Sequence, residues 1–219
     1  MGFRTYAGRV RDRDLPFKRR FSALRCAVGH YHPIGFNATW SYLTTTGNLR
    51  RDESALIRAL DVLELSRSAW LAEIDAFAAR RRLEKRKHRR SPLASETRYL
   101  YGYRWPGPEG HRVMFRAVGI LWAQHALVPF PEVSTSERDK LVELNATIAD
   151  CVSTYLRNNG TVGSGHRDTL HSCLRKLNTH LIHHFPSPFH DAFVYHHRLL
   201  KVTELLVNDA FPVRHREPG

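Results

Sequence analysis

The sequence predicts a mainly α-helical protein, and three observations lead to that prediction. Residues 52–90 contain no Gly or Pro, and their apolar residues recur at helical spacing. The Gly and Pro residues elsewhere often fall where helices start or stop. The second half of the chain carries four further apolar-periodic segments joined by short connections, a pattern that favours antiparallel helices.

Residues 1–50 are expected to form a basic arm with one short helix followed by an irregular stretch. Leu15-Pro16 after Asp14 is typical of a helix start, since Pro suits a first turn. The residues that then recur on one face are Phe17, Phe21, Leu24 and Val28. Gly and Pro interrupt residues 29–48, so we expect that stretch to be irregular and to pack on a surface through its aromatic rings.

Residues 51–92 are predicted to be one long helix with a basic C-terminal end. Its apolar positions form a heptad seam in which Arg67 is a polar break: Leu56, Leu60, Leu63, Trp70, Ile74 and Phe77. At 1.5 Å per residue such a helix is roughly 55–60 Å long. We expect it to project from the rest of the chain with the basic end at its far tip, or else to bend near Arg80.

Residues 93–110 are expected to be an extended aromatic linker. Four aromatic residues alternate there, namely Tyr99, Tyr101, Tyr103 and Trp105. Alternation is typical of an extended segment, because successive side chains then point to opposite faces. The rings suit packing against a partner, packing against the chain's own domain, or stacking on nucleic-acid bases beside Arg98 and Arg104.

Residues 111–219 are predicted to be an antiparallel helical bundle. Ser134 and Glu137 have the spacing of a capping box, and Asn158-Asn159-Gly160 is typical of a helix end. The most apolar stretch, residues 113–130, contains Arg116, Gln124 and His125 and is shorter than the ~20 residues that a membrane span needs. We therefore expect a buried helix there, with no transmembrane span.

The net charge of +13 indicates an anionic partner. Residues 1–110 carry +11 of it, and Arg outnumbers Lys by 28 to 6. Arg makes forked contacts with phosphate oxygens, although dense basic runs are also often simply solvated. The candidate contacts to lipid phosphate or nucleic acid are Arg11, Arg13, Lys18, Arg19 and Arg20 in the arm, and Arg80, Arg81, Arg82, Lys85, Arg86, Lys87, Arg89 and Arg90 at the helix tip.

No motif in the sequence specifies a reaction or a cofactor. The zinc-protease pattern, the nucleophile elbow, the phosphate-binding loop and the dinucleotide fingerprint are absent from the sequence. The one weak metal candidate is the pair His180 and His184, which are four residues apart and share a helix face. The sequence therefore favours a protein that is not an enzyme.

The function that these features favour is a non-catalytic structural or accessory subunit of a large multi-subunit assembly. Three Cys residues indicate a reducing compartment, and the Arg-rich start loosely matches a mitochondrial address, although Asp12 and Asp14 weaken the match. The expected setting is a membrane-associated energy-transducing complex with anionic lipid, or a mitochondrial ribosome with its RNA. The alternatives are a stand-alone nucleic-acid-binding protein and a metal-binding helical enzyme.

Overall fold

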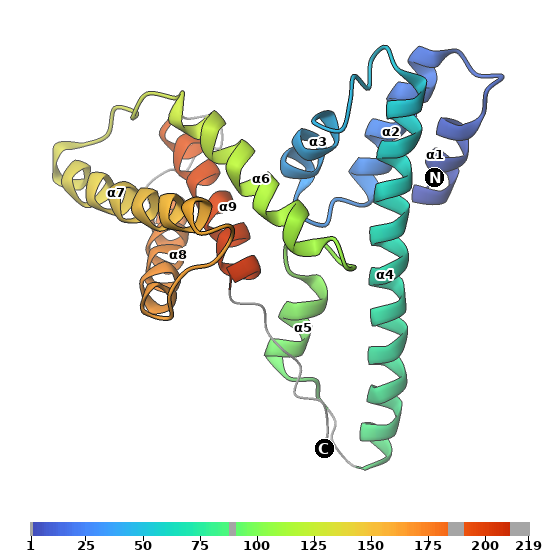
Figure 1. Cartoon of the computed structure of the whole chain (residues 1–219). Coiled ribbons are helices and arrows are strands. Elements are labelled where there is room, and N and C mark those ends of the chain that lie inside the picture. Colours follow the sequence, from blue (N-terminus) through green and yellow to red (C-terminus); the bar gives the residue numbers. More distant parts are fainter. Residues whose placement is uncertain (1, 88–90, 184–190, 211–219) are drawn as a thin grey trace. The chain divides into compact units, whose positions relative to one another are not determined.

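The computed structural model describes residues 2–87, 91–183 and 191–210, and within them it contains nine helices and no strand (Figure 1). The predicted all-α fold class is therefore confirmed. The chain divides into two compact units, one reaching to Val113 and the other beginning at Met114. We call them unit 1 and unit 2 and describe each by itself.

Unit 1 is built around one long helix. Its helices are α1 (Phe3–Arg11), α2 (Phe17–His30), α3 (Phe36–Thr44), α4 (Glu53–Arg86) and α5 (Ala94–Tyr101). The Asp52 carboxylate caps α4 by accepting the Ser54 N–H at 2.8 Å. The 34 residues of α4 make a rod of about 51 Å, and its predicted continuation over residues 88–90 lies outside the described residues.

The heptad seam of α4 is buried in its first half and only half-buried in its second. Leu56, Leu60 and Leu63 are fully buried, whereas Trp70 and Phe77 are half-buried. The helices α1 and α2 pack on the first half, and α5 packs on the second. The second half of α4 is therefore braced by α5, where the sequence predicts a projecting rod.

The helix α1 has no counterpart in the sequence prediction, which places a basic arm there. Phe3, Ala7 and Val10 lie on one face and are buried. The Phe3 ring meets the Tyr31 ring edge-on at 6.0 Å, and the Arg67 guanidinium lies 4.9 Å above it. The polar break in the α4 seam is thus a cation–π contact that helps to attach α1.

Two segments expected to be irregular or extended each contain a short helix, with turns and irregular backbone around it. Within residues 29–48, α2 continues to His30 and α3 occupies Phe36–Thr44; Gly35, at φ 85°, precedes α3. Within residues 93–110, α5 takes up Ala94–Tyr101. Glu96 begins α5 by accepting the backbone N–H of Leu93 at 2.8 Å, which is the backbone half of a capping box.

Unit 2 is the predicted antiparallel bundle. Its helices are α6 (Gly110–Ala126), which starts at the boundary between the units, α7 (Thr135–Arg157), α8 (Gly165–His183) and α9 (Asp191–Ala210). The fully buried residues of its core include Leu141, Ile148, Leu170, Leu177 and Leu206. The turn after α7 uses Asn159 and Gly160, whose φ angles are 50° and 88°.

The apolar helix that the sequence places over residues 113–130 is α6. Val113, Ala117 and Val118 are buried, as a core helix requires. Across the described ranges, none of the helices combines the length and apolar character needed to cross a bilayer.

Candidate anion-binding surfaces

The basic residues predicted near the N-terminus divide into structural and exposed ones. Arg20 is 4% exposed; its Nε donates to the Val10 carbonyl at 2.8 Å, and its Nη1 donates to Glu53 at 2.9 Å. Arg11 contacts Asp61 and Glu64, both at 2.5 Å. Arg20 and Arg11 therefore hold α2 and α1 to α4, where the sequence predicts surface contacts to an anion.

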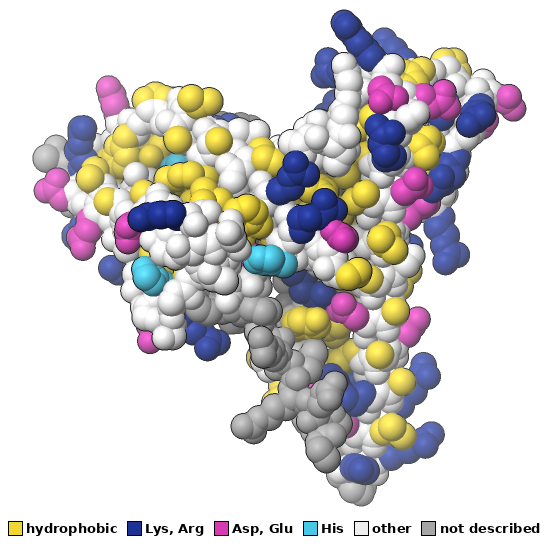
Figure 2. Space-filling view, viewed as in Figure 1, with side chains coloured by type: hydrophobic (Ala, Val, Ile, Leu, Met, Phe, Trp, Pro, Cys, Tyr) yellow, Lys and Arg dark blue, Asp and Glu magenta, His cyan; other side chains and the backbone are white. Residues whose placement is uncertain are grey.

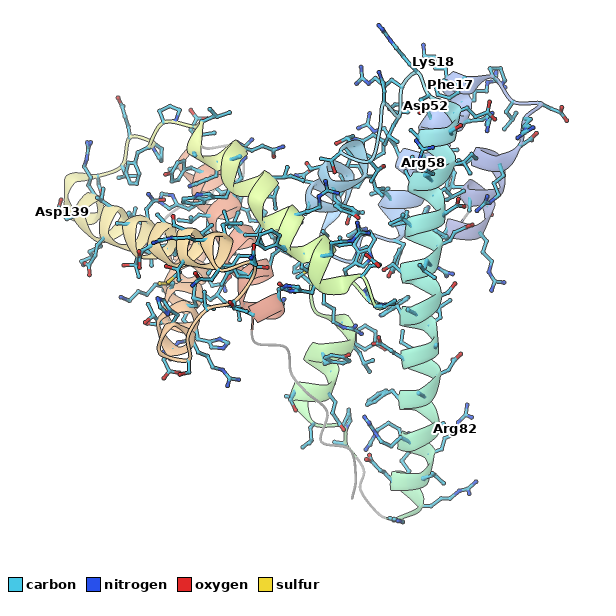
Figure 3. All side chains as sticks on the ribbon, in the orientation of Figure 1. Phe17, Lys18, Asp52, Arg58, Arg82 and Asp139 are labelled. Atoms are coloured by element: carbon cyan, nitrogen blue, oxygen red, sulfur yellow. The ribbon has the colours of Figure 1, made fainter. Side chains whose placement is uncertain are left out.

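The other three cations of the predicted N-terminal set are exposed. Arg13 lies 3.7 Å from Glu53 with 87% of its side chain accessible. Lys18 and Arg19 lie in the first turn of α2, and neither pairs with an acid among the described residues. Figure 3 shows Lys18 beside the start of α2. These cations are available at the surface of unit 1.

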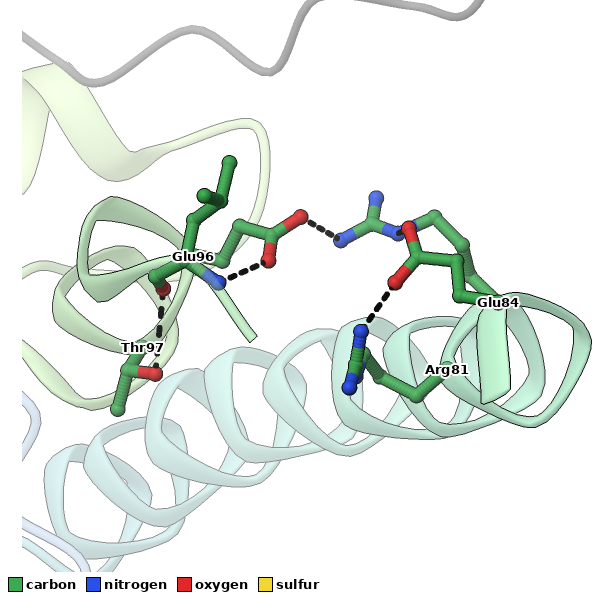
Figure 4. Close-up of polar contacts among 6 residues, drawn as sticks. Arg81, Glu84, Glu96 and Thr97 are labelled. Atoms are coloured by element: carbon green, nitrogen blue, oxygen red, sulfur yellow. Dashed lines mark hydrogen bonds and ion pairs between the residues drawn. The ribbon is translucent and has the colours of Figure 1, made fainter. Parts of the chain in front are cut away.

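Two arginines at the α4 tip are likewise used inside unit 1 (Figure 4). The Arg80 guanidinium contacts Glu96 at 3.2 Å and Glu84 at 3.9 Å. Arg81, which is 7% exposed, pairs with Glu84. Since Glu96 also caps α5, this network fixes α5 to the tip. Arg80 and Arg81 therefore serve within the unit, where the sequence predicts anion contacts.

Four further cations at the tip are exposed: Arg82, Lys85, Arg86 and Lys87. None of them forms an ion pair with an acid in the described part of the chain. Figure 3 shows Arg82 on the side of α4 away from α5, and Figure 2 shows basic side chains gathered at this end of the helix. Arg89 and Arg90 lie outside the described residues.

The four predicted partner-packing aromatics have different environments. Trp105 is 5% exposed and meets the Tyr42 ring at 5.4 Å, so it belongs to the core of unit 1. The Arg104 guanidinium covers the Tyr99 ring at 4.1 Å and also pairs with Glu73. Tyr103 is half-buried. Tyr101, at 65% exposed, is the ring that unit 1 leaves accessible in this segment.

A second basic surface, which the sequence does not single out, lies between α2, α3 and the loop before α4. It is a groove of about 460 Å³ lined by Phe21, Arg25, Trp40, Thr44, Gly47, Asn48, Leu49 and Arg50. One signal in the sequence points to it: Phe21 and Arg25 are four apart and so share a face of α2. Trp40 and Arg50 are far from Phe21 in the sequence, and folding brings both side chains against its ring.

Of the two weak metal candidates, His184 lies outside the described residues. Across residues 2–87, 91–183 and 191–210, no three His, Cys, Asp or Glu side chains come together as a metal site would require. His180 lines an open groove of about 850 Å³ between α7 and α8, beside Asp168, Lys140 and Lys176. The groove carries both signs of charge and selects no ligand class.

Two other histidines are buried among aromatic rings. His125, at 2% exposed, lies 4.4 Å from the Tyr195 ring, and His196 is fully buried with its Nδ1 2.8 Å from the Ala192 carbonyl oxygen. Burial lowers the pKa of both imidazoles. Neither His125 nitrogen makes a well-directed hydrogen bond, although nearby Asn145 opposes the pKa shift. Both rings are therefore neutral core groups at pH 7.

The buried thiols of unit 2 are poor nucleophiles. Burial raises the pKa of Cys151 to about 11, and it also raises the pKa of Cys173. Because the thiolate is the reactive form, both groups are protonated and inert near neutral pH. The exposed thiol of the chain is Cys26, on α2.

Comparison with known proteins identifies no relative: no family model, no curated protein and no solved structure matches the chain.

Proposed function

We propose that this protein is a non-catalytic accessory subunit of a larger ribonucleoprotein assembly in the mitochondrion, and that it contacts RNA phosphates through the tip of α4. The observation that carries the proposal is the set of four exposed cations within six residues, Arg82, Lys85, Arg86 and Lys87. None of the four pairs with an acid in the described part of the chain.

The structure separates these cations from those that stabilise the fold. Glu96 of α5 pairs with Arg80, and Glu84 pairs with Arg81 within α4. Lys85 and Arg86 lie in the last turn of α4, where cations stabilise the helix by complementing its dipole. The dipole therefore explains part of the basic character of this turn. Arg82 lies a turn earlier, and like charges so close repel one another unless an anion neutralises them.

An anionic lipid surface is the second candidate, and one observation favours it. Leu83 and Leu93 are 58% and 54% exposed, and they lie at the end of α4 and the start of α5. Exposed apolar side chains among cations are typical of a membrane-surface contact. They equally suit burial against a neighbouring protein subunit.

The test compares two quadruple variants of the full chain. The first replaces Arg82, Lys85, Arg86 and Lys87 by Gln. The matched control replaces two Arg and two Lys on α7 and α8 by Gln, namely Arg138, Lys140, Arg175 and Lys176, all exposed. Fluorescence anisotropy with a labelled single-stranded RNA measures the dissociation constant as a function of salt.

The tip variant is expected to bind RNA more weakly and to lower the magnitude of the salt slope by about 3, since each phosphate contact contributes about 0.7. The control is expected to keep the parental slope. Equal slopes for the two variants would contradict the proposal. Retention on vesicles containing acidic phospholipid, together with an unchanged RNA slope, would favour the lipid alternative.

A further inference from the structure

The groove between α2, α3 and the loop before α4 combines two aromatic rings with two guanidinium groups. The Phe21 and Trp40 rings meet edge-to-face at 5.7 Å and 74°. The Arg25 guanidinium lies 5.6 Å above the Trp40 ring, and the Arg50 guanidinium lies 5.9 Å above the Phe21 ring. The volume of about 460 Å³ lies within the range of about 300–1,000 Å³ that small-molecule sites occupy.

The two guanidinium groups are oriented by the rings but are not neutralised. Arg25 and Arg50 are exposed, and neither pairs with an acid in the described parts of the chain. The nearest acids in sequence already have partners: Asp52 contacts Arg58 at 3.5 Å, and Glu53 contacts Arg20 at 2.9 Å. An aromatic ring carries no formal negative charge, so each guanidinium keeps its positive charge and can still attract an anion.

The floor of the groove is fixed before any ligand arrives. Gly47 has φ 157°, and a Cβ there would lie 2.6 Å from the Ala55 Cβ, so the loop can approach α4 this closely only with Gly at this position. Leu49 is 3% exposed, and the Asn48 Oδ1 accepts the Arg50 N–H at 3.2 Å. A loop held in this way loses little conformational entropy on binding.

We infer that this groove is a nucleotide-binding site for single-stranded RNA, in which one base stacks on the Trp40–Arg25 or Phe21–Arg50 pair and its phosphate lies between the two guanidinium groups. Aromatic rings and guanidinium planes are the surfaces on which unpaired bases stack. Exposed Lys18 shares the face of α2 with Phe21 and Arg25 and extends the basic surface along the backbone. The phosphate of an anionic phospholipid would contact the cations but would leave the rings without a stacking partner.

This inference deepens the proposed function and rests on it, because it names a second contact with the same RNA. The experiment uses the full chain and three variants. Arg25→Gln with Arg50→Gln removes both cations, and Trp40→Leu removes one stacking face. Arg4→Gln with Arg9→Gln is the matched control, since both arginines are exposed and Arg9 also lies 5.7 Å above a ring, that of Tyr6.

The probe is a short oligoadenylate that carries one photoactivatable base. We expect crosslinks to peptides containing Phe21 or Trp40 in the parent and the control, and their loss in the Arg25/Arg50 variant. Trp40→Leu is expected to weaken binding at least about fivefold, as loss of one base-stacking contact does. Circular dichroism melting identifies any variant that has unfolded. If Trp40→Leu is unfolded, Trp40→Phe is used in its place; because it keeps an aromatic ring, it is expected to retain the crosslink.

The outcomes separate this inference from the proposed function. Unchanged crosslinks and affinity in both groove variants overturn the inference, while a reduced salt slope in the tip variant would still support the RNA contact at α4. Competition by inorganic phosphate as strong as that by adenosine monophosphate also overturns it, because the site would then bind a simple anion. If none of the tip or groove variants weakens RNA binding, and binding by the parent does not change with salt, both proposals are wrong.

Discussion

Unit 1 and unit 2 bury ionisable side chains in opposite ways. Unit 1 buries Arg20 and Arg81 and provides each with a carboxylate, Glu53 and Glu84. Unit 2 buries His125 and His196 among aromatic rings. Guanidinium stays protonated at any ordinary pH and must be given partners, whereas an imidazole can release its proton when it is buried. The two units should therefore respond differently to the loss of a partner and to acid.

The largest effect should come from removing the buried cation of unit 1. Arg20→Ala deletes the donor to the Val10 carbonyl and the contact to Glu53, and it leaves a space beneath α2. Because Glu53 is half-exposed and can be solvated, we expect a loss of about 2–3 kcal/mol in the free energy of unfolding, which is the range for a charge-assisted hydrogen bond with its packing. Urea denaturation measures it.

The control for that change is Arg13→Ala, which removes a cation near the same carboxylate. Arg13 lies 3.7 Å from Glu53 but is 87% accessible, so its removal should leave the urea midpoint almost unchanged. Similar losses in the two variants would mean that burial does not distinguish the two arginines.

The next effect is the acid response of unit 2. The folded-state pKa of His125 and of His196 is lowered by burial, so the unfolded chain binds more protons as the pH falls. The stability that the neutral rings contribute is present above the ordinary pKa of about 6.5 and is lost as the pH falls below it. The loss is at most about 1.4 kcal/mol per pH unit for each histidine.

Amide hydrogen exchange at pH 7 and pH 5.5, corrected for intrinsic rates, measures this response in each unit. We expect protection in α6 and α9 to fall at the lower pH, and His196→Phe to reduce that fall. His166→Phe, at a half-buried position outside the aromatic cluster, is the control. An equal fall for the parent and His196→Phe would show that His196 does not contribute to the response.

The smallest effect concerns the attachment of α5 to α4. Glu96 is 8% exposed and joins the Leu93 N–H to the Arg80 guanidinium (Figure 4). Glu96→Ala should cost about 1 kcal/mol, as the loss of a helix cap does, and should increase exchange in α5 more than in α2. Glu109→Ala removes an exposed pair with Arg112 and should change stability much less. Uniform destabilisation of unit 1 would contradict a local role for Glu96.

The sequence predicts the helices whose own pattern is long or well punctuated. The α4 seam from Leu56 to Phe77 and the signals on either side of α7, Ser134 before it and Gly160 in the turn after it, are visible without any tertiary structure. The short helices α1, α3 and α5 are not, because helices of eight or nine residues are unstable alone and form only when packed. Phe3, for example, stabilises α1 through its contact with the Tyr31 ring, and that contact exists only in the folded chain.

Periodicity, punctuation and residue counts were enough to predict the all-α class, the long helix, the bundle and the concentration of net charge in the first half of the chain. Which cations remain at the surface became clear from the packing of the helices. Arg80 and Arg82 lie in the same basic run of the sequence. Arg80 forms an ion pair with Glu96, sixteen residues away, whereas Arg82 pairs with no described acid. The strength of an ion pair depends on the distance between the two charges, and that distance is set by the packing of helices that are far apart in the sequence.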